Sequence, residues 1–132
     1  MAFQKFTAYG AGSRDRCTLR VSGYLFVPRA IAQLVAPEPP KQVLLYFDPE
    51  SQLLALVPGD SLIDAPEELR EVSDEPSGIA VNIVPLLRAH KLAKLEKKLM
   101  VDAETIEIES RKAIQVDLGE VPTLESGPNR KW

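Results

Sequence analysis

The order of sequence elements repeats once along this chain, and this repeat constrains the fold more than any other feature. Ser22-Gly23 recurs as Ser77-Gly78 at an offset of 55 residues, and Asp48-Pro49-Glu50-Ser51 recurs as Asp102-Ala103-Glu104-Thr105 at an offset of 54. In both halves the predicted order is a strand, a helix that opens with proline, and a hairpin. We interpret this as two degenerate copies of one strand-helix-hairpin unit. Two unrelated segments with this common order of elements are the alternative.

One such unit has too few strands to bury both of its faces, so we expect two units to share a core. A chain of 132 residues with 45% hydrophobic residues is long enough for one core without metal or disulfide staples. We therefore predict a β-rich α+β fold in a single domain over residues 1–118. Its units cover about 15–58 and 77–118, with an acidic linker over 59–76 and a flexible C-terminal tail over 119–132.

Short apolar or alternating runs predict the elements of the first half. Predicted strands cover residues 3–9, 16–27 with a bend at Ser22-Gly23, 41–47 and 52–57. A short helix is predicted over 28–36, because proline at the first helical position loses no hydrogen bond.

The second half gives a similar series of predictions. A strand is predicted over 79–84, a helix over 85–98, a hairpin over 98–110 that turns at Asp102–Thr105, and a last strand over 112–118. In the acidic linker, the stretch 65–72 predicts one or two helical turns.

The stretch from Ser22 to Leu34, followed by the predicted hairpin, resembles the AbrB/MazE/MraZ superfamily of swapped-hairpin DNA-binding domains. The resemblance is best over residues 18–58. Its pattern is a glycine, a strand ending in Val-Pro, a basic residue and a short helix, at Gly23, Val27, Pro28, Arg29, Ile31 and Leu34. The resemblance implies that two units interlock their hairpins into a small barrel, and that the protein is a DNA-binding transcriptional regulator or antitoxin-like protein.

Charge is distributed unevenly along the chain. The net charge is −3, yet the segment from Asp60 to Pro76 alone holds seven acidic residues and one basic residue. The rest of the chain therefore carries a net charge of +3. This pattern indicates a basic body with an acidic linker, although a solvated loop without a partner gives the same count.

Two groups of basic residues are candidates for contacts to nucleic-acid phosphates. Arg14, Arg16 and Arg20 alternate along a predicted strand and share one face, with Arg29 at the start of the next helix. The second group, at helical spacing, consists of Arg88, Lys91, Lys94 and Lys98. Both groups have a structural alternative, as a solvated strand face that deters edge pairing and as an exposed helix face.

Nothing in the sequence indicates catalysis. The chain has no GxSxG, Walker, HExxH or CxxC pattern, and His90 and Cys17 have no partners at metal-ligand spacing. We expect no enzyme activity, no cofactor and no metal. A small hydrolase with an unrecognised acidic site has the least support.

The environment and partners are predicted from the same residues. The apolar runs are too short to cross a bilayer, and the start of the chain lacks the pattern of a secretory signal, so we expect a cytoplasmic monomer or homodimer. DNA is the first expected partner. A protein docked on the C-terminal tail with Trp132 is the second.

Two functional hypotheses follow. The leading one is a DNA-binding regulator or antitoxin-like protein that uses Arg14, Arg16, Arg20 and Arg29. The alternative is a protein-interaction or assembly module of AbrB-like fold, viral or mobile-element accessory in character, that does not bind DNA. Net acidity favours the alternative, as do Tyr24 and Phe26, which stand where the superfamily usually has Gln and Thr.

Overall fold

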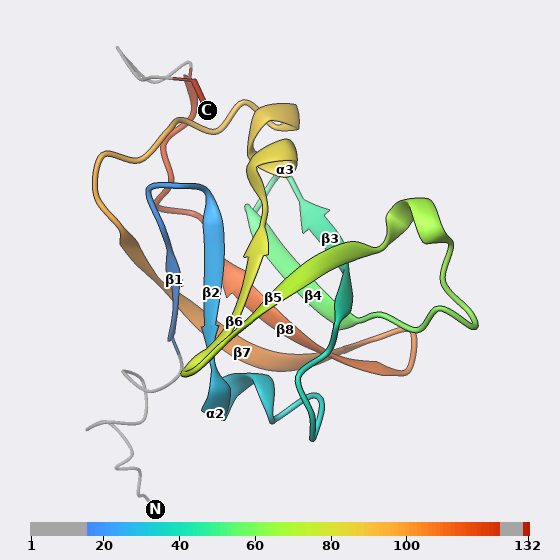
Figure 1. The fold of residues 1–132 in the computed structure, drawn as a ribbon. Helices are drawn as coiled ribbons and strands as arrows, with labels where there is room; N and C mark the ends of the chain where they lie inside the picture. The colour runs from blue at the N-terminus through green and yellow to red at the C-terminus, as the bar shows by residue number, and fades with distance from the viewer. Residues whose placement is uncertain (1–15, 125–130) are drawn as a thin grey trace, which may run out of the picture.

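A computed structural model describes residues 16–124 and 131–132, which form a closed barrel of eight antiparallel strands (Figure 1). The strand order around the barrel is β1-β2-β6-β5-β3-β4-β8-β7. The predicted strand over 3–9 lies outside the described residues. No helix in the described ranges is long and apolar enough to cross a membrane.

The elements of the first half are β1 (Arg16–Leu19), β2 (Tyr24–Pro28), α2 (Arg29–Ala32), β3 (Gln42–Asp48) and β4 (Leu53–Pro58). Those of the second half are the 3-10 helix η1 (Pro66–Glu68), β5 (Arg70–Glu75), β6 (Gly78–Asn82), α3 (Val84–Ala89), β7 (Leu99–Ile108) and β8 (Arg111–Asp117).

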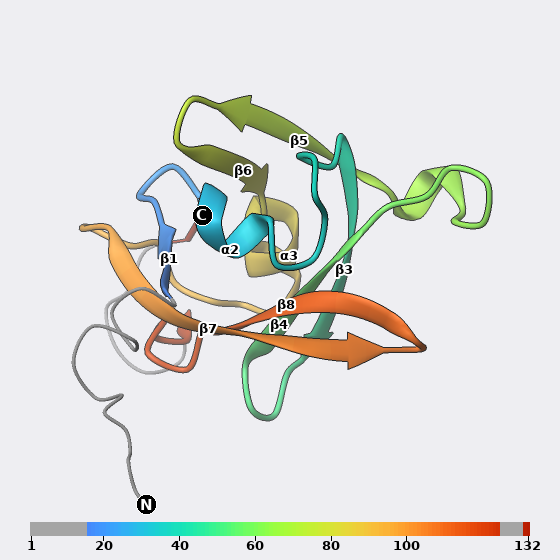
Figure 2. The ribbon, with the colours of Figure 1, turned by 90° about the horizontal axis from the view of Figure 1, so that it is seen from below.

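The predicted α+β class is wrong. The architecture is an antiparallel closed barrel, and the two α-helices within residues 16–124 have only 4 and 6 residues. Figure 2 shows both helices as short segments over the ends of the barrel rather than as a layer packed on a sheet. Each half holds a hairpin, a short helix and a second hairpin, so the predicted strand-helix-hairpin unit is wrong by one strand. The predicted AbrB-like barrel of two such units is part of the same fold-class prediction and is also wrong.

Pairings in the second half follow the same pattern as those in the first. Hairpins β1–β2 and β3–β4 correspond to β5–β6 and β7–β8. Four seams join the halves, β2 with β6, β4 with β8, β1 with β7 and β3 with β5. In the first seam Leu25 faces Val81 and Val27 faces Ile79, and all four side chains are buried. Closure of the barrel therefore depends on strands far apart in the sequence.

Both turns of the predicted repeat need correction. The stretch 16–27 is a hairpin rather than one bent strand, because Gly23 adopts a φ of 89° and the amide of Arg20 donates to the carbonyl of Tyr24 at 2.9 Å. Asp102–Thr105 is not a turn but lies inside β7. The second turn is at Glu109-Ser110, where both residues have positive φ, as a two-residue hairpin turn requires.

The predicted helix over 85–98 is also wrong beyond Ala89. Lys91 adopts a φ of 57°, and the chain then runs in a non-helical conformation to β7. Leu92, Ala93 and Leu95 are buried there, and the amide of Ala93 donates to the carbonyl of Pro122 at 2.7 Å. Tertiary contacts thus override the helical propensity of this stretch.

β5 is the strand that the sequence analysis missed. Its sequence REVSDE has Val72 as the only apolar residue, and no residue of the strand is buried. The two sides of β5 therefore give no alternation of apolar and polar residues, which is the signal used to predict strands. The strand forms because its backbone pairs with β6 on one side and with β3 on the other.

Described parts of the predicted tail lie against the barrel. Val121 is 2% exposed, and the amide of Leu124 donates to the carbonyl of Lys91 at 2.9 Å. Trp132 packs against the main core, and its carbonyl oxygen accepts a hydrogen bond from Nε of Arg88 at 3.1 Å.

The core makes a direct prediction. Leu25→Ala should lower the free energy of unfolding by about 2–5 kcal/mol, because Leu25 is fully buried opposite Val81 and its truncation leaves a cavity. The matched control is Leu34→Ala at a side chain that is 53% exposed, which should cost less than about 1 kcal/mol. Chemical denaturation measures both, and equal losses would contradict the placement of β2.

Candidate functional site

Three of the four candidate arginines have intramolecular partners. Arg20 forms a bidentate ion pair with Glu75, with both N–O distances at 2.9 Å, and lies over the ring of Phe26 at 4.9 Å. The guanidinium holds the pKa of the Glu75 carboxyl below its usual value. Arg29 donates to the main-chain carbonyls of Glu75 and Pro76 at 3.1 and 2.9 Å. These two arginines therefore fasten the β5–β6 turn to the first half of the chain.

Arg16 is less engaged than Arg20 and Arg29. Arg16 lies 3.4 Å from Asp102, and both side chains are largely exposed, so the pair contributes little to stability. Arg14 lies outside the described residues.

The second basic group does not form a helical stripe. Arg88 lies on α3, whereas Lys91, Lys94 and Lys98 follow the end of the helix. Their side chains are exposed and alternate irregularly with the buried Leu92, Ala93 and Leu95. The structure thus brings these residues onto one connecting segment at the α3 end of the barrel, but not onto one helix face (Figure 1).

His90 and Cys17 pack against other residues of the fold and do not form a catalytic or metal-binding group with other described residues. The His90 ring packs on Phe47 with ring centroids 4.4 Å apart. Cys17 is buried in the core, and this burial raises the pKa of its thiol to about 12. Among the described residues, no three His, Cys, Asp or Glu side chains are grouped so that they could hold a metal ion.

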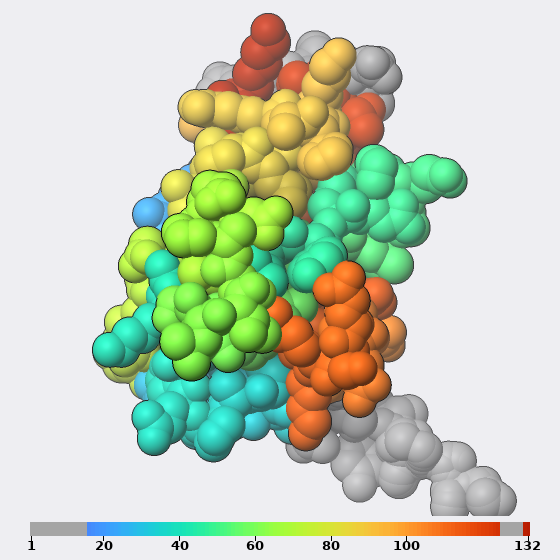
Figure 3. Space-filling view, turned by 90° about the vertical axis from the view of Figure 1, so that its right-hand side faces the viewer, coloured from blue at the N-terminus to red at the C-terminus, as the bar shows by residue number. Residues whose placement is uncertain are grey.

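A protruding loop in the acidic segment is the strongest candidate for a functional surface. We define the acidic loop as residues 59–69, between β4 and β5. At its apex Leu62 is 90% exposed and Ile63 is 69% exposed, the two highest values among the large hydrophobic residues described as exposed. Figure 3 looks onto this face, where the loop stands out in green between α3 and the β7–β8 hairpin.

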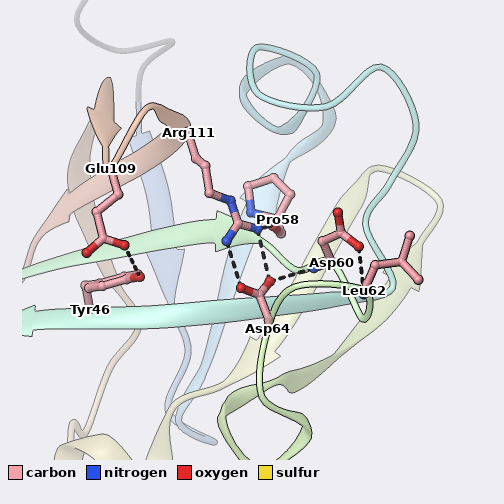
Figure 4. A network of polar contacts seen from close by, with 7 residues as sticks. All are labelled: Tyr46, Pro58, Asp60, Leu62, Asp64, Glu109 and Arg111. Atoms are coloured by element: carbon pink, nitrogen blue, oxygen red, sulfur yellow. Dashed lines mark hydrogen bonds and ion pairs between the residues drawn. The ribbon is translucent and has the colours of Figure 1, made fainter.

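Hydrogen bonds fix the conformation of the apex. The amide of Leu62 donates to Oδ1 of Asp60 at 2.9 Å, and the amide of Asp64 donates to the carbonyl of Asp60 at 2.8 Å. In return, the amide of Asp60 donates to Oδ2 of Asp64 at 2.7 Å. The two aspartates thus close the turn that carries Leu62 and Ile63 (Figure 4).

Arg111 ties this turn to the barrel. Its guanidinium donates to both carboxylate oxygens of Asp64, at 2.8 and 3.1 Å, and to the carbonyl of Pro58. The hydrogen bonds from Arg111 lower the pKa of Asp64. Figure 4 shows Arg111 reaching across from the β7–β8 turn, beside the Glu109 carboxylate that accepts a long hydrogen bond from the Tyr46 hydroxyl. The apex is therefore held from outside its own segment.

A satellite apolar cluster supports the base of the loop. Leu69 is 9% exposed and packs on the outer face of the barrel with Leu44 and Val57. The cluster also includes Ala55 and Ala113. Leu69 therefore fixes the C-terminal end of the acidic loop.

An open groove of about 410 Å³ lies beside the loop. One wall is formed by Leu44, Leu45 and Tyr46 of β3, and the opposite wall by residues of α3. Glu67, Glu68 and Arg70 form its rim, and the remaining lining residues are Asn82, Pro85, Leu86, Ala89 and His90. The groove thus combines apolar side chains of β3 and α3 with polar ones, among them the carboxylates of Glu67 and Glu68.

The acidic character of this segment is visible in the sequence, but its architecture is not. Its seven acidic residues are visible in the sequence, whereas the pairing of Asp64 with Arg111 joins residues 47 positions apart. The one local signal was the adjacent pair Leu62-Ile63 in an otherwise polar stretch.

No protein-family model matches this chain, and neither a curated protein sequence nor a solved structure matches it. The resemblance of Ser22–Leu34 to the AbrB/MazE/MraZ superfamily therefore stays a prediction.

The Asp64–Arg111 pair makes a pH prediction. Because the pKa of Asp64 is lower in the folded protein than in the unfolded chain, the pair stabilises the fold above the unfolded pKa. This contribution is lost as pH falls through the folded pKa. In Arg111→Gln, NMR titration should show the pKa of Asp64 returning toward its usual value, and the amides of the acidic loop should exchange faster.

Lys112→Gln is the matched control for that variant. It removes one positive charge from an exposed neighbour on the same strand, and no ion pair of Lys112 is present in the described structure. An Asp64 titration that is the same in both variants would contradict the assigned pairing.

Proposed function

We propose that this protein is a non-enzymatic protein-interaction module that binds its partner through the acidic loop. The observation that carries the proposal is the exposure of Leu62 and Ile63 at the apex of a loop that Asp60, Asp64 and Arg111 hold in one conformation.

Single exposed apolar residues are common on protein surfaces, so the argument depends on their setting. Leu62 and Ile63 are adjacent, they protrude, and hydrogen bonds of Asp60 and Asp64 close the turn that carries them. A loop that is fixed before binding loses little conformational entropy in a complex. Apolar anchors surrounded by polar residues are also the usual arrangement of interface hot spots.

The chemistry of the loop also defines its partner. Glu67 and Glu68 follow the apex, are exposed, and have no ion pair within the described part of the chain. Electrostatic complementarity therefore favours a partner surface in which a shallow apolar pocket is bordered by lysine or arginine.

DNA binding remains the second candidate function, on different residues from those first expected. Arg20 and Arg29 are engaged within the fold, whereas Lys91, Lys94, Lys97 and Lys98 are exposed and have no ion pair among residues 16–124. Four cations on one segment can contact phosphates, but the acidic loop has no role in such a complex.

Site-specific photo-crosslinking in cells that express the full chain tests the proposal. A benzophenone amino acid at Leu62 should give a defined protein adduct, and the same group at Met100 should not. Met100 is a suitable control because it is 47% exposed on β7, away from the acidic loop. The adduct protein is then identified and purified.

The affinity for that purified partner is then measured. Ile63→Asp should weaken this affinity roughly 30-fold, since an apolar anchor contributes about 2 kcal/mol of binding free energy. Adducts that are the same from Leu62 and Met100, or a partner whose affinity is unchanged by Ile63→Asp, would refute the proposed function.

A further inference from the structure

The seam between β3 and β5 is short and leaves part of β3 without a neighbour. β3 pairs with β4 from Val43 to Asp48, but with β5 only at Gln42 and Val43. In the seam that corresponds to it under the repeat, β7 pairs with β1 at four residue pairs, from Leu99 to Asp102. Within the described residues β7 also extends past its partner, over residues 103–108, so the open edge of β3 is distinguished by the groove that lies beside it.

Two hydrogen bonds show which backbone groups of β3 point to this edge. Gly59 on the β4 side donates to the carbonyl of Gln42 at 2.7 Å, and Val72 on the β5 side donates to the carbonyl of Lys41 at 3.0 Å. Backbone groups alternate between the two sides of a strand. The amide and carbonyl groups of Leu45 and Phe47 therefore point toward the β5 side.

No strand occupies the positions opposite these groups. Continuing the register Val43–Arg70 would place Glu68 opposite Leu45 and Pro66 opposite Phe47. Both residues instead lie in η1, which turns away from the upper part of β3 (Figure 1). Within residues 16–124 the amides of Leu45 and Phe47 thus have no strand partner on this edge.

The groove of about 410 Å³ lies along this open edge. Leu45 and Tyr46 line one side of it, and Leu86 of α3 lines the other. Glu67 and Glu68 stand at its rim without an ion pair among the described residues. The groove therefore offers unpaired backbone groups, an apolar wall and two carboxylates within one concave surface.

We propose that this groove binds an extended, basic segment of the partner protein as an additional strand on β3. The inference rests on the proposed function and extends its binding surface from the acidic loop into the groove. Main-chain groups of the segment pair with Leu45 and Phe47, which is the mode of β-strand addition. Alternate side chains of the segment contact Leu86 on one side and solvent on the other.

Charge complementarity determines the class of segment. The stretch from Asp60 to Pro76 holds seven acidic residues against one basic residue, Arg70. The guanidinium of Arg70 donates to the main-chain carbonyl of Glu67 at 3.1 Å, so Arg70 does not pair with either rim carboxylate. A lysine or arginine in the bound segment therefore finds two unpaired carboxylates at the rim.

A random library of short peptides, selected against the purified full chain, supplies the probe. The selected peptides should carry alternating apolar residues and at least one lysine or arginine. Glu67→Lys/Glu68→Lys should weaken the best peptide at least about tenfold. The control Glu107→Lys/Glu120→Lys makes the same change in net charge at exposed positions away from the groove and should leave the affinity unchanged.

Methylation of the peptide backbone tests strand addition itself. N-methyl groups at alternate residues should abolish binding in one phase, where the amides face β3, and leave it nearly unchanged in the other phase. Equal effects in both phases, no selected peptide, or no effect of Glu67→Lys/Glu68→Lys would each overturn the inference.

Two further measurements distinguish this inference from the proposed function of the acidic loop and from binding of a second copy of this chain. If Leu62 cross-links a partner whose affinity depends on Ile63 but not on Glu67 and Glu68, the proposed function stands and the groove inference fails. If light scattering shows a dimer that Glu67→Lys/Glu68→Lys dissociates, the groove holds a second copy of this chain, and a basic partner segment is excluded.

Discussion

The seam of two residue pairs between β3 and β5 is the constraint on which the candidate functional surface depends. Pairing ends at Val43 because η1 takes the chain away from β3 at Glu68. The same departure creates the acidic loop, opens the groove and leaves the edge of β3 uncovered. The candidate functional surface therefore lies where β5 separates from β3.

The loop is attached to the barrel by contacts that lie outside its own sequence. Asp60 and Asp64 shape the turn, but Arg111 of β8 attaches it to the barrel, and Leu69 buries its base against Leu44. A bidentate arginine–carboxylate pair fixes both distance and orientation, which a single surface lysine does not. Leu62 and Ile63 are consequently presented in a defined place, although neither is packed against the fold.

Local patterns predicted the elements that carry their own apolar residues. Strands β3, β4, β6 and β8 were found to within a few residues, because each is a short run with at least two buried apolar residues. β5 was missed because it contributes backbone pairing rather than apolar side chains, and α3 was overextended because Leu92 and Leu95 fill the core from a non-helical segment.

The acidic character of the site was visible in the sequence, whereas its tether Arg111 and the open edge of β3 depend on contacts between distant strands. The arginines expected to contact DNA illustrate the same limit, since the pairing of Arg20 with Glu75 spans 55 residues.

Hydrogen exchange of β3 in the free protein tests the central claim most directly. The amides of Leu44 and Tyr46 pair with β4, so they should exchange slowly, whereas those of Leu45 and Phe47 face the open edge and should exchange much faster. This alternation is the predicted result. Equally slow exchange at all four amides would show that the edge is already covered, and would contradict the account.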